Sequence, residues 1–171
     1  MFKTHPDGML PEPTPERVLA VCNMAAKQPM EKEEMQRLLT MNWKADADYS
    51  IVRASMEVAV DDLGLLQIKD GLICYRADPG IIASPTAFRR YISNKVFSIE
   101  DSTFTKFSKW IIALNERLFS LRKWEVMAKT CKEESVDIRN VGENDVLGWR
   151  FWAVFLGLGY LSGTMLIPNM K

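Results

Sequence analysis

Two stretches of the sequence decide the fold, because each carries a glycine between large apolar residues where a helical pattern gives way to a β pattern. They are MEVAVDDLGLLQIKDG (56–71) and FWAVFLGLGYLSGTM (151–165). Large apolar residues at helical spacing lead to Gly64 in the first stretch and, in the alignment we adopt, to Gly159 in the second. A glycine there suits the left-handed residue that ends many helices. The sequence therefore predicts a repeated module in which a helix passes into a β-ribbon.

The first copy of the module has clear helix and hairpin signals. A helix is expected to start at Pro15 with Thr14 as its N-cap, and to stop before Pro29. Further helices are expected over residues 30–41 and 48–63. Asp70-Gly71 then lies between two β-rich runs, which is a strong hairpin signal. The predicted order is three helices followed by a two-stranded ribbon.

The segment SIVRASMEVAVDDLGLLQIKDGLICYR (50–76) resembles the winged-helix superfamily. The resemblance implies that this segment holds the third helix, the Leu-Gly-aliphatic sequence at which the chain leaves that helix, and the β-ribbon called the wing. It implies a fold more than a function, because many activities use this fold.

The second copy follows the same layout. Its helices are expected over residues 105–121 and 123–135 and along ENDVLGWRFWAVFLGLGYL (143–161), with a short wing that turns at Ser162-Gly163. Before it, residues 82–98 are expected to form a linker helix capped by Ser84. The predicted fold class is mainly α with small β-ribbons (α+β), built as two winged-helix-like modules joined by a linker helix. The predicted boundaries are a flexible arm over 1–14, domain 1 over 15–83, the linker helix over 84–104 and domain 2 over 105–171.

Composition bears on the class of protein. Lys and Arg balance Asp and Glu at 22 each, but residues 84–132 carry 10 basic and 4 acidic residues and are the only strongly basic part. The three cysteines are far apart and lack metal-ligand spacing, and the first residues lack an apolar leader, which favours a cytoplasmic protein.

No arrangement typical of catalysis is found in the sequence. The single histidine, His5, lies in the expected arm, and acidic pairs such as Asp46/Asp48 fall on predicted turns and helix surfaces. No phosphate-binding glycine loop or nucleophile motif occurs. We therefore expect no enzyme activity, cofactor, metal or small-molecule substrate.

Nucleic-acid contacts follow from the winged-helix resemblance. It implies that Tyr49, Ser50 and Arg53 on the third helix face the major groove and that Lys69 on the wing reaches a phosphate. Neighbouring acidic residues weaken this interpretation, because they repel the phosphate backbone. The linker helix offers a second basic set, consisting of Arg89, Arg90 and Lys95. Nucleic-acid binding is thus expected to be weak.

The run WRFWAVF (149–155) points to a protein partner or a homo-oligomer. With Phe151 and Phe155 in the core, Trp149 and Trp152 are expected to point sideways as a partner surface or a seam between domains. The same region raises a second interpretation, since residues 151–168 hold no charge and reach the minimum length of a membrane-spanning helix. The glycines and the final proline argue against a membrane anchor.

The sequence leads to one main hypothesis and two alternatives. The main one is a non-catalytic tandem winged-helix adaptor or subunit of a DNA-associated assembly, of the kind that the resemblance associates with chromosome maintenance or bacterial defence. The first alternative is a sequence-specific transcriptional regulator that reads DNA through its third helix and wing. The second is a protein anchored in a membrane through residues 151–168.

Overall fold

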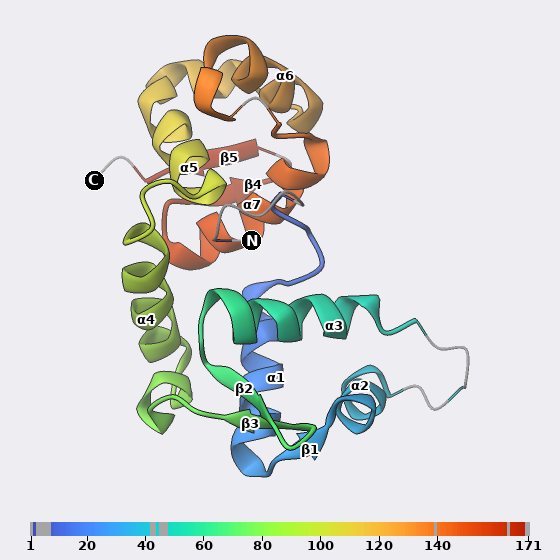
Figure 1. The fold of residues 1–171 in the computed structure, drawn as a ribbon. Coiled ribbons are helices and arrows are strands. Elements are labelled where there is room, and N and C mark those ends of the chain that lie inside the picture. The colour runs from blue at the N-terminus through green and yellow to red at the C-terminus, as the bar shows by residue number, and fades with distance from the viewer. Residues whose placement is uncertain are drawn as a thin grey trace. The chain divides into compact units, whose positions relative to one another are not determined.

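The structure is a computed structural model that describes residues 2, 8–41, 44, 48–138, 140–163 and 165–169. His5 and Asp46 lie outside the described residues. The fold is mainly helical with small antiparallel β-ribbons, as the sequence predicts. It divides into two compact units: an N-terminal unit over Glu12–Ile92, and a C-terminal unit made of Met1–Pro11 and Ser93–Lys171. Figure 1 shows the elements of both.

In the N-terminal unit, three helices precede a small sheet. Its elements are α1 (Pro15–Lys27), β1 (Met30–Glu31), α2 (Lys32–Thr40), α3 (Ser50–Glu57), the π-helical turn η1 (Val58–Asp62), β2 (Leu66–Lys69), β3 (Leu72–Tyr75) and the 3-10 turn η2 (Pro79–Ile82). Helix α1 contacts α2, α3 and β3, so it lies at the centre of this unit. The apolar stripe that the sequence predicts for it is buried, with Val18, Val21 and Ala25 inside.

The predicted hairpin is confirmed. Strands β2 and β3 pair antiparallel, with Ile68 opposite Ile73 and Lys69 opposite Leu72. Asp70 and Gly71 join the strands with φ of 53° and 78°, the two positive values that a tight hairpin turn of this kind requires. The sequence did not indicate β1, which adds a short third strand beside β3.

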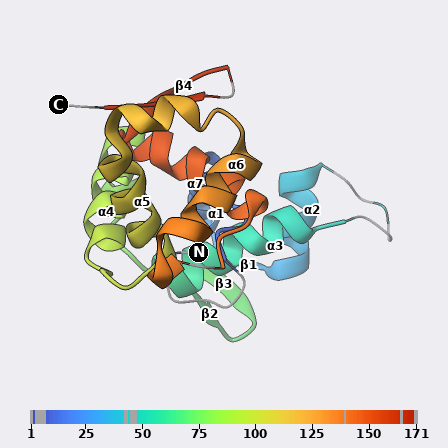
Figure 2. The same cartoon turned by 90° about the horizontal axis from the view of Figure 1, so that it is seen from above.

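In the C-terminal unit the order is again three helices and a ribbon. Its elements are α5 (Thr103–Leu114), the 3-10 turn η3 (Asn115–Ser120), α6 (Trp124–Glu134), the 3-10 turn η4 (Val136–Ile138), α7 (Glu143–Leu156), β4 (Gly159–Ser162) and β5 (Met165–Pro168). Figure 2 shows α6 and α7 close together, and the two helices are in contact. The helix predicted over 105–121 is shorter, because Asn115 has a φ of 47° and ends α5.

The boundary between the units falls within α4 (Pro85–Phe97), which Ser84 caps by accepting a hydrogen bond from the Ala87 N–H at 3.1 Å. On the N-terminal side, the Tyr91 hydroxyl donates to the Leu63 carbonyl at 2.7 Å. On the C-terminal side, the Thr105 hydroxyl donates to the Val96 carbonyl at 3.3 Å. The helix thus belongs partly to each unit, whereas the sequence was interpreted as one linker over 84–104.

The two units repeat each other with a constant spacing of 93 residues. Ser50 and Glu143 begin the third helices, Leu66 and Gly159 begin the first strands, and Tyr75 and Pro168 end the second strands, each pair being 93 positions apart. Buried residues of α1 match buried residues of α5 and of the turn η3 that follows it. Val18 and Val21 are 93 positions from Ile111 and Leu114 of α5, and Ala25 is 93 positions from Leu118 of η3. We call residues 93 positions apart equivalent.

This spacing corrects the alignment made from the sequence. The residue equivalent to Gly64 is Gly157, and the two segments Leu63–Leu65 and Leu156–Leu158 are identical. Gly64 and Gly157 have φ of 67° and 81°, whereas Gly159 already lies in β4. After α7 the N–H of Leu158 donates to the Ala153 carbonyl and that of Gly157 to the Val154 carbonyl, which is the Schellman pattern. The helix therefore ends two residues earlier than predicted.

The first residues of the chain are not a free arm in the part that is described. The side chains of Phe2 and Met9 are fully buried, and the ring of Phe2 packs edge-on against Trp152, with the centroids 4.8 Å apart. We call Phe2 and Gly8–Pro11 the strap. The prolines and glycine of this segment predict an extended arm, but they carry no signal for where the segment docks.

The strap crosses α7 at Gly148. A Cβ atom added to Gly148 would lie 2.0 Å from the Met9 carbonyl oxygen and 2.5 Å from that of Leu10. The Asp145 carboxylate accepts hydrogen bonds from the Met9 N–H and, at 2.7 Å, from the Gly142 N–H. Asp145 therefore caps the start of α7 and holds the strap with the same side chain.

The exit glycines provide a first prediction. No atom lies within 4 Å of a Cβ added at Gly64 or Gly157, so only the positive φ opposes a side chain there. We expect Gly64→Ala and Gly157→Ala each to lower the free energy of unfolding by roughly 1–2 kcal/mol. Asn at either position should cost less, since its side chain tolerates this conformation. Urea unfolding followed by circular dichroism measures both, and an equal cost for Ala and Asn would contradict the explanation.

The strap provides a second prediction. In the full chain, Gly148→Ala should destabilise the C-terminal unit, because the new methyl group collides with the strap backbone. In a chain that lacks residues 1–11, the same change should stabilise it by about 1 kcal/mol, the usual gain of Ala over Gly inside a helix.

Tryptophan fluorescence during urea unfolding mainly follows this unit, because four of the five tryptophans belong to it, namely Trp110, Trp124, Trp149 and Trp152. The experiment uses a Trp43→Phe background to remove the signal of the N-terminal unit. The same sign for Gly148→Ala in both chains would contradict the prediction. If the shortened chain does not fold, faster proteolysis of residues 1–11 in full-length Gly148→Ala provides the second readout.

Candidate binding surfaces

The aromatic run of α7 lies inside the C-terminal unit. Trp149 and Trp152 are both fully buried, whereas Phe151 and Phe155 are only partly buried. The indole N–H of Trp149 donates to the Ser108 hydroxyl at 2.8 Å, and its ring packs edge-on against Phe107. The expected partner surface at Trp149 and Trp152 is therefore wrong. The face of α7 that points inward is rotated from the predicted one, because the strap covers Trp152 on a side that sequence reasoning left open.

The uncharged stretch 151–168 is not one helix. It ends α7 at Leu156, turns at Gly157 and forms the β4–β5 ribbon, in which Tyr160 pairs with Ile167. Among the residues that the structure describes, no helix is long and apolar enough to cross a membrane. The membrane anchor predicted for this stretch is contradicted by its ribbon.

The residues expected to read DNA lie at the start of α3 and at the tip of the ribbon. Arg53 and Lys69 are exposed, while Tyr49 and Ser50 are partly covered. Exposed acidic side chains accompany them on the same helix region: Asp48, Glu57 and Asp61. The N–H of Ser50 donates to Asp48 at 2.8 Å and lowers the pKa of that carboxyl. Arg53 is therefore accompanied by negative charge, and Asp48 interacts with it electrostatically.

The basic residues of α4 do not share one face. Arg89, Arg90 and Lys95 are all exposed. With about 100° between successive residues of a helix, Arg89 and Lys95 flank the buried stripe of Phe88, Ile92 and Val96 on opposite sides, and Arg90 lies behind it. The helix therefore presents three separated charges and no basic stripe.

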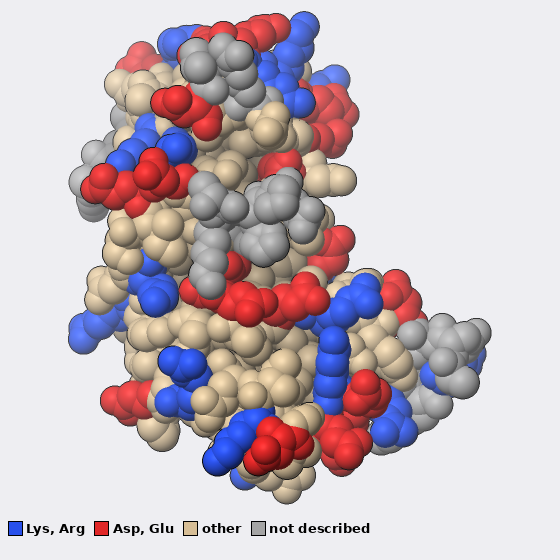
Figure 3. All heavy atoms as spheres, viewed as in Figure 1, with Lys and Arg blue, Asp and Glu red and all other residues tan. Residues whose placement is uncertain are grey.

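Ion pairs neutralise part of the basic segment that follows. Lys106 pairs with Asp101 at 3.2 Å, and Arg117 pairs with Glu134. Lys129 lies 3.9 Å from Glu133. On the face drawn in Figure 3, Lys and Arg side chains are interspersed with Asp and Glu, without one continuous basic area. The excess of positive charge in residues 84–132 thus does not form a phosphate-tracking surface on that face.

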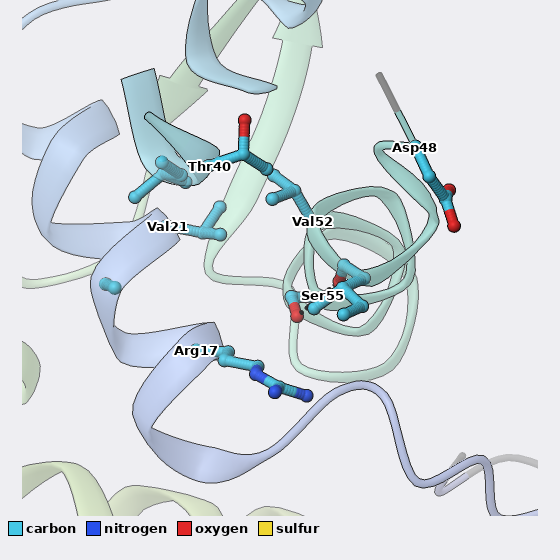
Figure 4. Close-up of a pocket in the computed structure, with 9 residues that line it drawn as sticks. Arg17, Val21, Thr40, Asp48, Val52 and Ser55 are labelled. Carbon is cyan, nitrogen blue, oxygen red and sulfur yellow. Dashed lines mark hydrogen bonds between the residues drawn. The ribbon is translucent and has the colours of Figure 1, made fainter. Parts of the chain in front are cut away.

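A pocket in the N-terminal unit was not indicated by the sequence. It has a volume of about 310 Å³ and lies between α1, the end of α2 and the start of α3. Figure 4 shows Arg17 and Val21 on one side of it, Thr40 at the end of α2, and Val52 and Ser55 on α3. Its lining residues are Arg17, Ala20, Val21, Leu39, Thr40, Asp48, Ile51, Val52 and Ser55. The lining is mostly apolar, with one base and one acid.

Exposed apolar side chains occur in the pocket and on the helix that borders it. Ile51, which lines the pocket, is 42% exposed, and Leu38 (36% exposed) and Met41 (87% exposed) lie at the end of α2, which contributes Leu39 and Thr40 to the lining. Met41 ends α2 in the left-handed conformation, with a φ of 51°. Apolar side chains that gather around a pocket on an exposed surface are typical of a binding site. The apolar pattern of one helix does not predict how α1, α2 and α3 pack against one another, so only the tertiary structure reveals this pocket.

The described residues offer little for catalysis. No group of three or more His, Cys, Asp or Glu side chains among them lies close enough together to hold a metal ion. Burial raises the pKa of Cys22 to about 12. Burial, assisted by the negative charge of Glu134, also raises the pKa of Cys131 to about 12. Neither thiol therefore forms a nucleophilic thiolate at neutral pH.

Comparison of the chain with protein-family models, with curated proteins and with solved structures finds no match.

The thiols provide a third prediction. At pH 8 in native buffer, Cys22 and Cys131 should react with a thiol reagent far more slowly than in urea, because burial blocks access and keeps them protonated. Cys74 is only partly buried and should supply the fast phase of the reaction. Cys74→Ser removes that phase. A fast phase that persists in Cys74→Ser would contradict the assignment.

Proposed function

We propose that this protein is a non-catalytic tandem winged-helix adaptor, a subunit of a DNA-associated multiprotein assembly of the chromosome-maintenance or bacterial-defence type. The order of three helices and an antiparallel ribbon, present twice at a constant spacing of 93 residues, supports the tandem arrangement. A chain of paired modules suits a role in which separate surfaces hold separate partners.

One observation favours docking over base reading. The exposed part of α3 combines Arg53 with Asp48, Glu57 and Asp61. Since phosphate contacts supply much of the affinity of DNA-binding proteins, this excess of acid works against a tight duplex complex. The mostly apolar pocket beside α3, which Asp48 also lines, favours a protein partner instead.

A DNA-binding measurement tests the proposal and provides the fourth prediction. Fluorescence anisotropy with labelled duplexes of varied sequence should detect weak binding with little sequence preference, and this binding should disappear as salt rises from about 50 to 200 mM. Glu57→Lys with Asp61→Lys should strengthen binding about tenfold or more, because it replaces repulsion by attraction at the phosphates. The matched control is Glu33→Lys with Glu34→Lys, a change of equal charge on the exposed side of α2.

Two results would favour other functions. A strong preference for one duplex sequence that Arg53→Ala and Lys69→Ala both abolish would identify a sequence-specific regulator. If the protein purified at native levels from its source ran as an isolated monomer by size-exclusion chromatography with light scattering, this would contradict the role as an adaptor.

A further inference from the structure

The pocket of the N-terminal unit lies at the position where the C-terminal unit holds the strap. Asp145 and Gly148, which contact Met9 and Leu10 of the strap, are equivalent to Val52 and Ser55, which line the pocket. In each pair the two residues are three positions apart, and the pairs lie at equivalent places on α7 and α3. The same helix face therefore meets an extended peptide in one module and borders an open pocket in the other.

The C-terminal unit shows what kind of chain this face accepts. The strap lies across α7 with its backbone against Gly148, and the side chain of Met9 is fully buried. The carboxylate of Asp145 on α7 accepts a hydrogen bond from the backbone N–H of Met9. The contact thus combines one backbone hydrogen bond with burial of an aliphatic side chain.

The N-terminal unit offers comparable groups in a different arrangement. The side chain of Val52, unlike that of the equivalent Asp145, cannot accept a hydrogen bond. Asp48 lies four residues before Val52 and lines the same pocket. Ser55 is larger than Gly148, but the volume of about 310 Å³ leaves room for a side chain of the size of Met or Leu. The hydrogen bond from the Ser50 N–H lowers the pKa of Asp48, so this carboxyl is ionised at neutral pH and ready to accept an N–H.

Arg17 adds a selective charge. Its side chain is exposed and lines the pocket from α1, facing α3 in Figure 4. One of its guanidinium N–H groups donates to the Glu12 carbonyl at 2.7 Å, and an arginine carries further N–H donors for a carboxylate. In the sequence of the strap, Met9, Leu10 and Pro11 are followed by Glu12. A ligand with this pattern would place a carboxylate within reach of Arg17, where charge complementarity strengthens and orients binding.

We propose that the pocket between α1, α2 and α3 binds an extended segment of a partner protein that carries a Met or Leu side chain followed closely by an acidic residue. Asp48 accepts a backbone N–H of this segment, the apolar side chain fills the space beside Val52 and Ile51, and Arg17 pairs with the acid. The inference rests on the proposed role as an adaptor and specifies the chemistry of its partner.

A peptide-binding experiment tests this and provides the fifth prediction. The probe is a labelled synthetic peptide with the sequence of residues 6–14, PDGMLPEPT, titrated with the full-length protein and followed by fluorescence anisotropy. Ala20→Trp fills the pocket from an exposed position on α1 and should weaken binding at least about tenfold. Arg17→Gln should weaken binding and reduce its dependence on salt.

Two matched variants control for the added indole ring. Ala113 is the exposed residue equivalent to Ala20, and Ala26 is an exposed residue of α1 outside the pocket. Ala113→Trp and Ala26→Trp should both leave binding unchanged, with circular dichroism to verify the fold of every variant. A probe with Asp in place of its Met and Leu should not bind.

Several outcomes would overturn the inference. These are the absence of saturable binding to the wild-type protein, binding that Ala20→Trp leaves intact, and binding that Ala113→Trp weakens more, which would place the peptide in the C-terminal unit. A dimer of the protein that Ala20→Trp dissociates would make a second copy the occupant in place of a partner. The assay contains no nucleic acid, so its failure is distinct from a failure of the DNA measurement.

Discussion

The left-handed residue at the end of each third helix is the constraint on which the structure depends. At Gly64 and Gly157 the chain leaves a helix, and the next residues enter a strand two positions later. A residue with a Cβ resists this conformation, so the segment Leu-Gly-Leu fixes both where the helix stops and where the ribbon starts. The register of each ribbon against its helices follows from that point, and so does the face of the helix that turns inward.

The parts of the fold that sequence reasoning predicted correctly are those with local physical causes. Asp70-Gly71 specified the hairpin because few other pairs adopt positive φ at both positions. The stripe of α1 and the left-handed residue Gly64 were equally local, whereas the helix predicted over 48–63 is divided into α3 and the π-helical turn η1. The second exit was misplaced by two residues, because Gly157 and Gly159 alternate with leucines and either fits a helix end by pattern alone. The structure separates the two choices, because Gly157 has the positive φ and the Asn169 N–H donates to the Leu158 carbonyl, as the Arg76 N–H donates to the Leu65 carbonyl in the first ribbon.

The candidate site was less predictable than the fold because it depends on contacts between distant segments. Trp149 and Trp152 were taken for a surface, since four aromatic residues in one turn and a half of helix exceed what one helix face buries. Phe2 and Met9, from the other end of the chain, supply the missing cover. The pocket was missed for a related reason. Ala20, Ile51 and Ser55 do not stand out in the sequences of their own helices, and they line a pocket only because three helices meet there.

The strap also constrains the order in which the parts of the chain can fold. The C-terminal unit joins residues 1–11 to residues 93–171, whereas the N-terminal unit is continuous over residues 12–92. During synthesis on the ribosome, the N-terminal unit is complete long before α7 exists, and the buried residues Phe2 and Met9 must wait for it in solvent. Because closing so long a loop costs conformational entropy, the strap can dock on α7 only after the whole stretch between them has been made.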